Sequence, residues 1–243
     1  MTAGALTRRQ LLVGIGSSTA LMTNAGYAQT GESVLRYTFN QETHSWIPGL
    51  CDYKLDATEL QFKAEVRQLP PKLQSDLRAY YLQCHNTPDD LFMFLKKELS
   101  ASDGIEPNRT YGVSIHVGFL SNAPSGLAGI GGSPGASVVL KAGVSLLEPV
   151  AILDTERLYV RLNLDKGDQI QSGGDLQVVS TIENGQPPQA IQPYVYLERV
   201  HHFPTFVHTD RRGVLWITVG AESGFEGLTG IYFYEIIVTL RSQ

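Results

Sequence analysis

Residues 111–119 read YGVSIHVGF, and every second position is apolar. Side chains of a β-strand point alternately to two faces, so this pattern predicts a strand with one buried face and one solvent-exposed face. The same period of two recurs in residues 60–67 and 158–164. Residues 91–95 are apolar throughout, which is typical of a strand covered on both faces. Residues 231–240, rich in Tyr, Phe, Ile and Val, predict the strongest strand of the chain.

Turn-forming residues separate these strands. Gly, Pro, Ser and Asp cluster at residues 123–126, 131–135, 172–175 and 185–188. Residues 72–81 have apolar side chains at helical spacing and predict one short helix. Many short strands with so little helix predict an all-β protein, a single jelly-roll-like β-sandwich.

The N-terminus has the features of an export signal. Arg8 and Arg9 precede a short, mildly apolar stretch that ends near Ala28 with small residues. We therefore expect residues 1–28 to be a twin-arginine signal peptide and residues 29–243 to form the single domain. The alternative is a membrane anchor, but the stretch is shorter than the roughly 20 apolar residues that span a bilayer. The expected partner is the twin-arginine translocase, and the expected location is the periplasm or the medium.

The charge balance limits the class of partner. The chain has a net charge of −5, and removal of Arg8 and Arg9 makes it more negative. Nucleic-acid binding uses basic stripes, so we expect no nucleic-acid partner. No later segment is long and apolar enough to predict a membrane span after cleavage.

Two cysteines, Cys51 and Cys84, make an even count. In an exported protein this favours a disulfide between them. The entropy that such a bond removes from the unfolded chain would stabilise the fold by roughly 3–4 kcal/mol. The alternative is a pair of buried free thiols.

Two short motifs resemble carbohydrate-binding jelly rolls. Residues 107–114, PNRTYGVS, are similar to the strand entry of those modules, and residues 231–238 are similar to their closing strand, although Ile236 departs from the usual pattern. Four longer segments resemble an uncharacterised family of exported bacterial β-sandwich proteins. These segments are residues 46–53, 89–94, 122–135 and 162–167. The first resemblance implies a jelly roll with a glycan ligand, and the second implies export and fold without an activity.

Residues 131–135, GGSPG, match the G-x-S-x-G pattern of α/β-hydrolases. In those enzymes the residue after the serine donates its backbone N–H to the oxyanion hole. Pro134 has no N–H, so Ser133 is not expected to be a nucleophile.

Glu235 is the candidate calcium ligand of the closing strand. It lies among apolar residues, where a covered carboxylate needs a cation or hydrogen-bond donors. The resemblance to carbohydrate-binding jelly rolls implies a calcium ion shared with an acid near the N-terminus, here Glu42. A salt bridge to an arginine is the alternative.

Histidines and acids supply the other candidates. His202 and His208 flank a turn and are candidate zinc ligands, although the short paired motifs of zinc sites are missing. Ordinary surface histidines are the alternative reading. His85, Asp89 and Asp90 precede an apolar strand, where turn chemistry is the competing explanation.

The function that these features favour is a non-catalytic, exported β-sandwich that binds an extracellular ligand, with a glycan as the favoured class. The expected ligand-binding residues are Trp46, Asp52, His85, Asp89 and Asp90. One alternative is a metal-dependent polysaccharide hydrolase or lyase, whose groups come from His85, Asp89, Asp90, His202 and His208. The other is a structural envelope protein without a ligand site.

Overall fold

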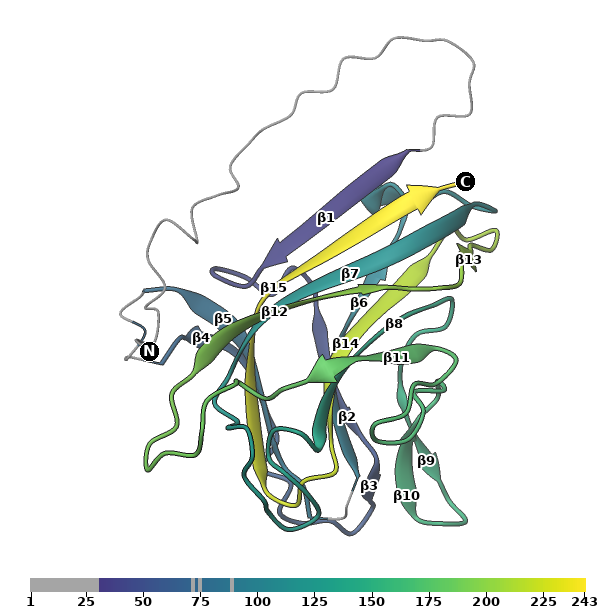
Figure 1. Ribbon diagram of the computed structural model, residues 1–243. Helices are drawn as coiled ribbons and strands as arrows, with labels where there is room; N and C mark the ends of the chain where they lie inside the picture. The colour runs from purple at the N-terminus through teal and green to yellow at the C-terminus, as the bar shows by residue number, and fades with distance from the viewer. Residues whose placement is uncertain (1–30, 71–72, 74–75, 88–89) are drawn as a thin grey trace.

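The computed structural model describes residues 31–70, 73, 76–87 and 90–243 (Figure 1). Residues 1–28, expected to be the signal peptide, and Asp89 lie outside this part of the chain. The described residues form β-strands and short 3₁₀ turns such as η2 (Ala101–Asp103), which confirms the all-β prediction. Within them, no helix has the length and apolar character needed to cross a membrane.

The largest sheet contains strands from both ends of the described chain. Its members are β1 (Glu32–Thr38), β4 (Lys63–Gln68), β5 (Arg78–His85), β7 (Thr110–Ser121), β12 (Val195–His202), β13 (Val207–His208) and β15 (Leu228–Ser242). The strand order is β12-β7-β15-β5-β4, with β1 paired to β15 and β13 paired to β7. All pairs are antiparallel. We call it the seven-stranded sheet.

Two further sheets complete the architecture (Figure 1). The five-stranded sheet consists of β2 (Ile47–Cys51), β6 (Leu91–Leu99), β8 (Val138–Ser145), β11 (Leu176–Thr181) and β14 (Leu215–Ser223). The three-stranded sheet consists of β3 (Tyr53–Lys54), β9 (Ala151–Asp154) and β10 (Tyr159–Leu162).

The main core lies between the seven-stranded and five-stranded sheets, as in a β-sandwich. The apolar positions of β7 that the alternation singled out, Tyr111, Val113, Ile115, Val117 and Phe119, are all buried there. Burial of such side chains contributes about 25 cal/mol per Å² of apolar surface and is the main force that holds the layers together.

A second, smaller core lies on the other side of the five-stranded sheet. Phe92 and Phe94 of β6 stack with ring centroids 5.3 Å apart, and they pack against Val160 and Leu162 of β10. Strand β6 is therefore covered on both faces, as its apolar run predicted. We call this side of the five-stranded sheet, under the three-stranded sheet, the covered face.

Two predictions about local structure are wrong. Residues 78–81 belong to β5 and not to a helix, because this strand pairs with β4 on one side and β15 on the other. Cys51 and Cys84 are both buried free thiols and form no disulfide. They lie in different hydrophobic clusters, and Cys51 Sγ donates a hydrogen bond to Asp52 while Cys84 Sγ donates one to the Leu60 carbonyl.

Candidate functional site

The seven-stranded sheet has an outer face that we call the open face. It carries the outward-pointing side chains of β12, β7 and β15, which alternate with the core residues. Along β7 these positions are Ser114, His116, Gly118 and Leu120, and β12 and β15 add partners at each level. Three zones follow from this order: a groove near Ser114, a group of ionisable side chains near His116 and Gly118, and tyrosines near Leu120.

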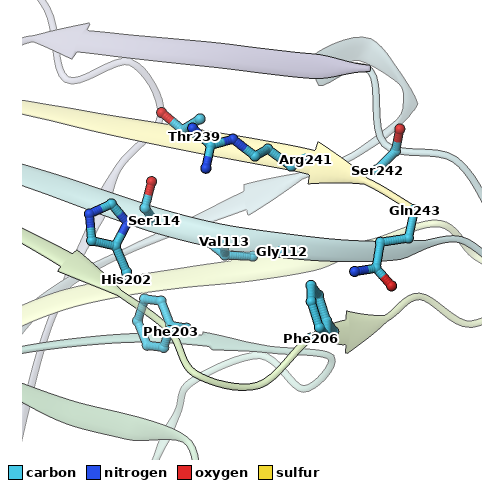
Figure 2. A pocket seen from close by; sticks show the side chains of 10 residues that line it. All are labelled: Gly112, Val113, Ser114, His202, Phe203, Phe206, Thr239, Arg241, Ser242 and Gln243. Carbon is cyan, nitrogen blue, oxygen red and sulfur yellow. The ribbon is translucent and has the colours of Figure 1, made fainter. Parts of the chain in front are cut away.

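A groove of about 330 Å³ crosses the first zone (Figure 2). Strands β7 and β15 form its floor, and the loop between β12 and β13 forms one side. Its lining residues are Gly112, Val113, Ser114, His202, Phe203, Phe206, Thr239, Arg241, Ser242 and Gln243. We call it the Phe206 groove.

Two phenylalanines give the groove its apolar surface. Phe206 is 59% exposed, and its ring lies so close to the backbone of Gly112 that an added Cβ there would be 3.2 Å from the ring. Phe203 is half-buried and makes an edge-to-face contact with His201, with ring centroids 4.8 Å apart. The Phe203 amide donates a hydrogen bond of 3.1 Å to the Val113 carbonyl, which fixes the loop along β7.

Polar groups line the rest of the groove. Arg241 forms an exposed ion pair of 2.7 Å with Glu32 of β1. Ser114, Thr239 and Gln243 offer hydroxyl and amide groups that both donate and accept hydrogen bonds. Among the ten described residues that line the groove, none has an acidic side chain.

Ionisable side chains from three strands meet in the second zone. One ligand atom each of His116, Glu198 and Glu235 lies within 4.8 Å of the other two. Arg36 Nη1 pairs with Glu235 Oε2 at 2.6 Å, and the Tyr196 hydroxyl donates to Glu198 Oε1 at 2.9 Å. The salt-bridge alternative for Glu235 is therefore confirmed. Glu42 pairs instead with His44 at 3.1 Å and is not grouped with Glu235.

Tyrosines fill the third zone. The Tyr81 and Tyr232 rings lie 4.6 Å apart and are nearly buried, and the Arg67 guanidinium lies 3.4 Å from the centre of the Tyr81 ring. The Arg67 guanidinium also donates to the Tyr232 hydroxyl at 2.6 Å. Rings packed in this way stabilise the sheet and leave little surface for a ligand.

The covered face holds a different group of charges, which we call the charge cluster. It consists of Asp52, Asp90, Lys141, Lys166 and Glu222. Lys166 Nζ contacts Glu222 and lies 3.2 Å from Asp52 and 3.8 Å from Asp90. Lys141 Nζ lies 2.5 Å from Glu222 Oε2, and neither side chain is exposed.

Charge balance explains the pKa values of the cluster. Three carboxylates face two ammonium groups, and the exposed Asp168 carboxylate lies within 4.8 Å of those of Asp90 and Glu222, so negative charge is in excess. Burial raises the pKa of Asp90 to about 8, although nearby Lys166 favours the ionised carboxylate. Burial acts to lower the pKa of Lys166, but Glu222, Asp52 and Asp90 outweigh it and the pKa is raised. The raised pKa of Asp90 favours its protonated form, which reduces the excess negative charge of the cluster.

The structure corrects the prediction for Trp46. This side chain is 3% exposed and packs edge-to-face against Tyr37 and Phe39, so it cannot stack on a ligand. Asp52 and Asp90 are partners of Lys166 in the charge cluster and face no groove that includes Trp46.

The predicted hydrolase group is not assembled. His85 pairs with Leu228 at one end of β15, whereas His202 lies beside Ser114, whose other neighbour is Thr239. Leu228 and Thr239 are roughly 35 Å apart along β15, at about 3.3 Å per residue. His208 pairs with Thr110 on the same edge of β7 as His202, roughly 13 Å away at that rise, so the two cannot share a zinc ion.

Sequence reasoning missed Phe203 and Phe206. The available signal was the segment HHFPTFVH, residues 201–208, in which two aromatic residues flank a proline-containing turn. Only the path of this loop along β7 shows that one ring remains exposed.

No protein-family model and no curated protein matches the chain. Solved structures with a similar fold include the carbohydrate-binding module TmCBM27, described for mannan recognition, with 11% identity, a TM-score of 0.38, and coverage of 86% of this chain and 98% of that one. The C-terminal family 22 carbohydrate-binding module of Clostridium thermocellum Xyn10B matches with 11% identity, a TM-score of 0.34, and coverage of 84% and 91%.

A longer neighbour comprises the CBM22-1 and GH10 modules of Clostridium thermocellum xylanase 10B in complex with xylohexaose. It matches with 12% identity and a TM-score of 0.36 over 84% of this chain, which spans 28% of that chain. The β-sandwich fold is shown by the packed sheets of this chain itself. The similarity to a family of exported bacterial proteins stays a prediction.

Proposed function

We propose that the protein is a non-catalytic β-sandwich that binds a neutral glycan in the Phe206 groove. The observation that carries the proposal is the Phe206 ring, 59% exposed at the side of a groove that Phe203 and several polar side chains also line. A sugar ring has one face of C–H groups with partial positive charge, which complements the negative face of an aromatic ring.

The polar lining suits the edge of a sugar. Hydroxyl groups donate and accept hydrogen bonds, and Ser114, Thr239 and Gln243 do both. Arg241 already forms an ion pair with Glu32, so its positive charge is not left to bind an acidic ligand.

Binding without catalysis follows from the same lining. Glycoside hydrolysis needs two carboxyl groups on either side of the scissile bond in most families. The described residues that line the groove provide no acidic side chain, and the acids of the charge cluster lie on the covered face.

Affinity electrophoresis tests the proposal, with soluble xylan, galactomannan and β-glucan cast in separate gels. We expect at least one polysaccharide to retard the wild type. Phe206→Ala should weaken that binding by about 2 kcal/mol, or roughly thirtyfold, because aromatic side chains at the centre of an interface contribute losses of this size. Phe62→Ala is the matched control, because Phe62 is 37% exposed but does not line the groove.

Two outcomes would contradict the proposal. Equal weakening by Phe206→Ala and Phe62→Ala would place binding elsewhere. No retardation in any gel would favour a structural protein of the cell envelope.

We further propose that the protein reaches its ligand by twin-arginine export to the periplasm or the medium, on the basis of Arg8 and Arg9 before a short apolar stretch. Replacing both arginines with lysine should leave the precursor in the cytoplasm. Normal levels of processed protein outside the cytoplasm would contradict this route.

A further inference from the structure

The second zone of the open face contains three potential metal ligands around a glycine. Glu198 of β12 and Glu235 of β15 both pair in register with Gly118, one on each side of β7. A Cβ on Gly118 would lie 2.5 Å from the Tyr196 hydroxyl and 3.0 Å from Glu235 Cγ. The missing side chain therefore leaves the space that the Tyr196 hydroxyl and the Glu235 side chain occupy.

His116 adds a nitrogen to this set. It lies two residues before Gly118, on the same face of β7, and one ring nitrogen is within 4.8 Å of a carboxylate oxygen of each glutamate. Its Nε2 atom is buried and has no hydrogen-bond partner. An imidazole nitrogen without a protein partner is available to bind a metal ion.

The neighbours hold the carboxylates in place. Arg36 fixes Oε2 of Glu235 at 2.6 Å, which leaves Oε1 directed toward Tyr196 at 3.4 Å. The Tyr196 hydroxyl donates a hydrogen bond of 2.9 Å to Glu198 Oε1. Partners that orient ligands in this way are a regular feature of metal sites.

We infer that His116, Glu198 and Glu235 bind a divalent transition-metal ion of the zinc type. Imidazole nitrogen with carboxylate oxygen suits zinc, whereas calcium prefers a shell of oxygens alone. Glu198 is exposed, so the ion has a path from solvent, and three protein ligands leave a position for water. The two glutamates and Arg36 carry one net negative charge, which a divalent cation reverses. This inference does not depend on glycan binding.

The experiment is isothermal titration of the protein, prepared without a histidine tag, with zinc chloride and separately with calcium chloride. We expect one zinc ion per chain, a higher melting temperature with zinc through mass action, and visible absorption bands when cobalt(II) takes its place. His116→Gln and Glu198→Gln should each weaken zinc binding about tenfold or more.

The controls are His202→Gln and His208→Gln, two exposed histidines outside the site, which should bind zinc as the wild type does. Metal-free melting temperatures close to that of the wild type show that each variant is folded. The inference is overturned by a wild type that binds no zinc, by affinity that survives both ligand substitutions, by equal losses in the control variants, or by binding of calcium alone.

Discussion

The two outer faces of the sandwich differ in whether their charged side chains are buried or exposed to solvent. On the covered face, the loop after β10 covers Lys141 and Glu222, which have no exposed side-chain surface. On the open face, Glu198 and Arg241 reach solvent, and the exposed Phe206 ring lines the same groove as Arg241. A buried charge needs a partner within the protein, whereas an exposed polar group can still exchange water for a ligand. We therefore propose that the covered face serves stability and that the open face serves recognition.

The largest expected effect is on the covered face. Lys166→Met removes the cation shared by Asp52, Asp90 and Glu222, so we expect the free energy of unfolding to fall by about 3–5 kcal/mol, as when a buried ion pair loses one member. The control is Arg157→Met, which breaks the exposed pair with Asp154 and should change stability by less than about 1 kcal/mol. Urea unfolding measures the free energy of unfolding of both variants. Similar losses in the two variants would contradict the distinction between the faces.

A smaller loss is expected at the packed centre of the open face. Gly118→Ala places a methyl group against Tyr196 and Glu235, and we expect a loss of about 1–3 kcal/mol from overpacking. Gly224→Ala is the control, because its nearest neighbour is a flexible side-chain atom at 3.4 Å. A Gly118→Ala protein as stable as the control would show that the carboxylates can move apart freely.

The charge cluster also predicts a dependence of stability on pH. An Asp90 carboxyl in the unfolded chain loses its proton near pH 3.8, whereas the folded one keeps it to about pH 8. Between these values the folded state binds the extra proton, so stability falls as pH rises through this window. Asp90→Asn should flatten the fall in melting temperature between pH 5 and pH 8. An equally steep fall in the melting temperature of the variant would show that other titratable groups cause the pH dependence.

The smallest effect is expected at the cysteines. Because both thiols are free and buried, dithiothreitol should leave the melting temperature unchanged. Burial, with the neighbouring Asp52 carboxylate, raises the pKa of Cys51, so its thiol should react with iodoacetamide only after unfolding. A drop in melting temperature on reduction would contradict the free thiols and support the disulfide that the sequence predicted.

The strands could be predicted because their cause is local. Alternation in residues 111–119 and the unbroken apolar run in residues 91–95 both follow from which faces a strand buries. The burial of Trp46 could not be predicted, since it depends on contact with Tyr37 and Phe39, which the turn before it brings close.

The sites were harder to predict because they depend on distant pairing. Asp52 and Asp90 were singled out as ligand-binding residues, yet their partner Lys166 lies far along the chain and its position is set by the loop after β10. Glu235 was identified correctly as a carboxylate that needs a partner. Its neighbours Arg36, Glu198 and His116 come from three other strands, and only sheet register brings them together.

Hydrogen–deuterium exchange with and without a retained polysaccharide tests most directly whether the open face is the binding face. We expect slower exchange in residues 110–116, 201–208 and 238–243, which form the Phe206 groove, and unchanged exchange in residues 158–176 over the covered face. Protection confined to residues 158–176, with the groove unaffected, would contradict the assignment of recognition to the open face.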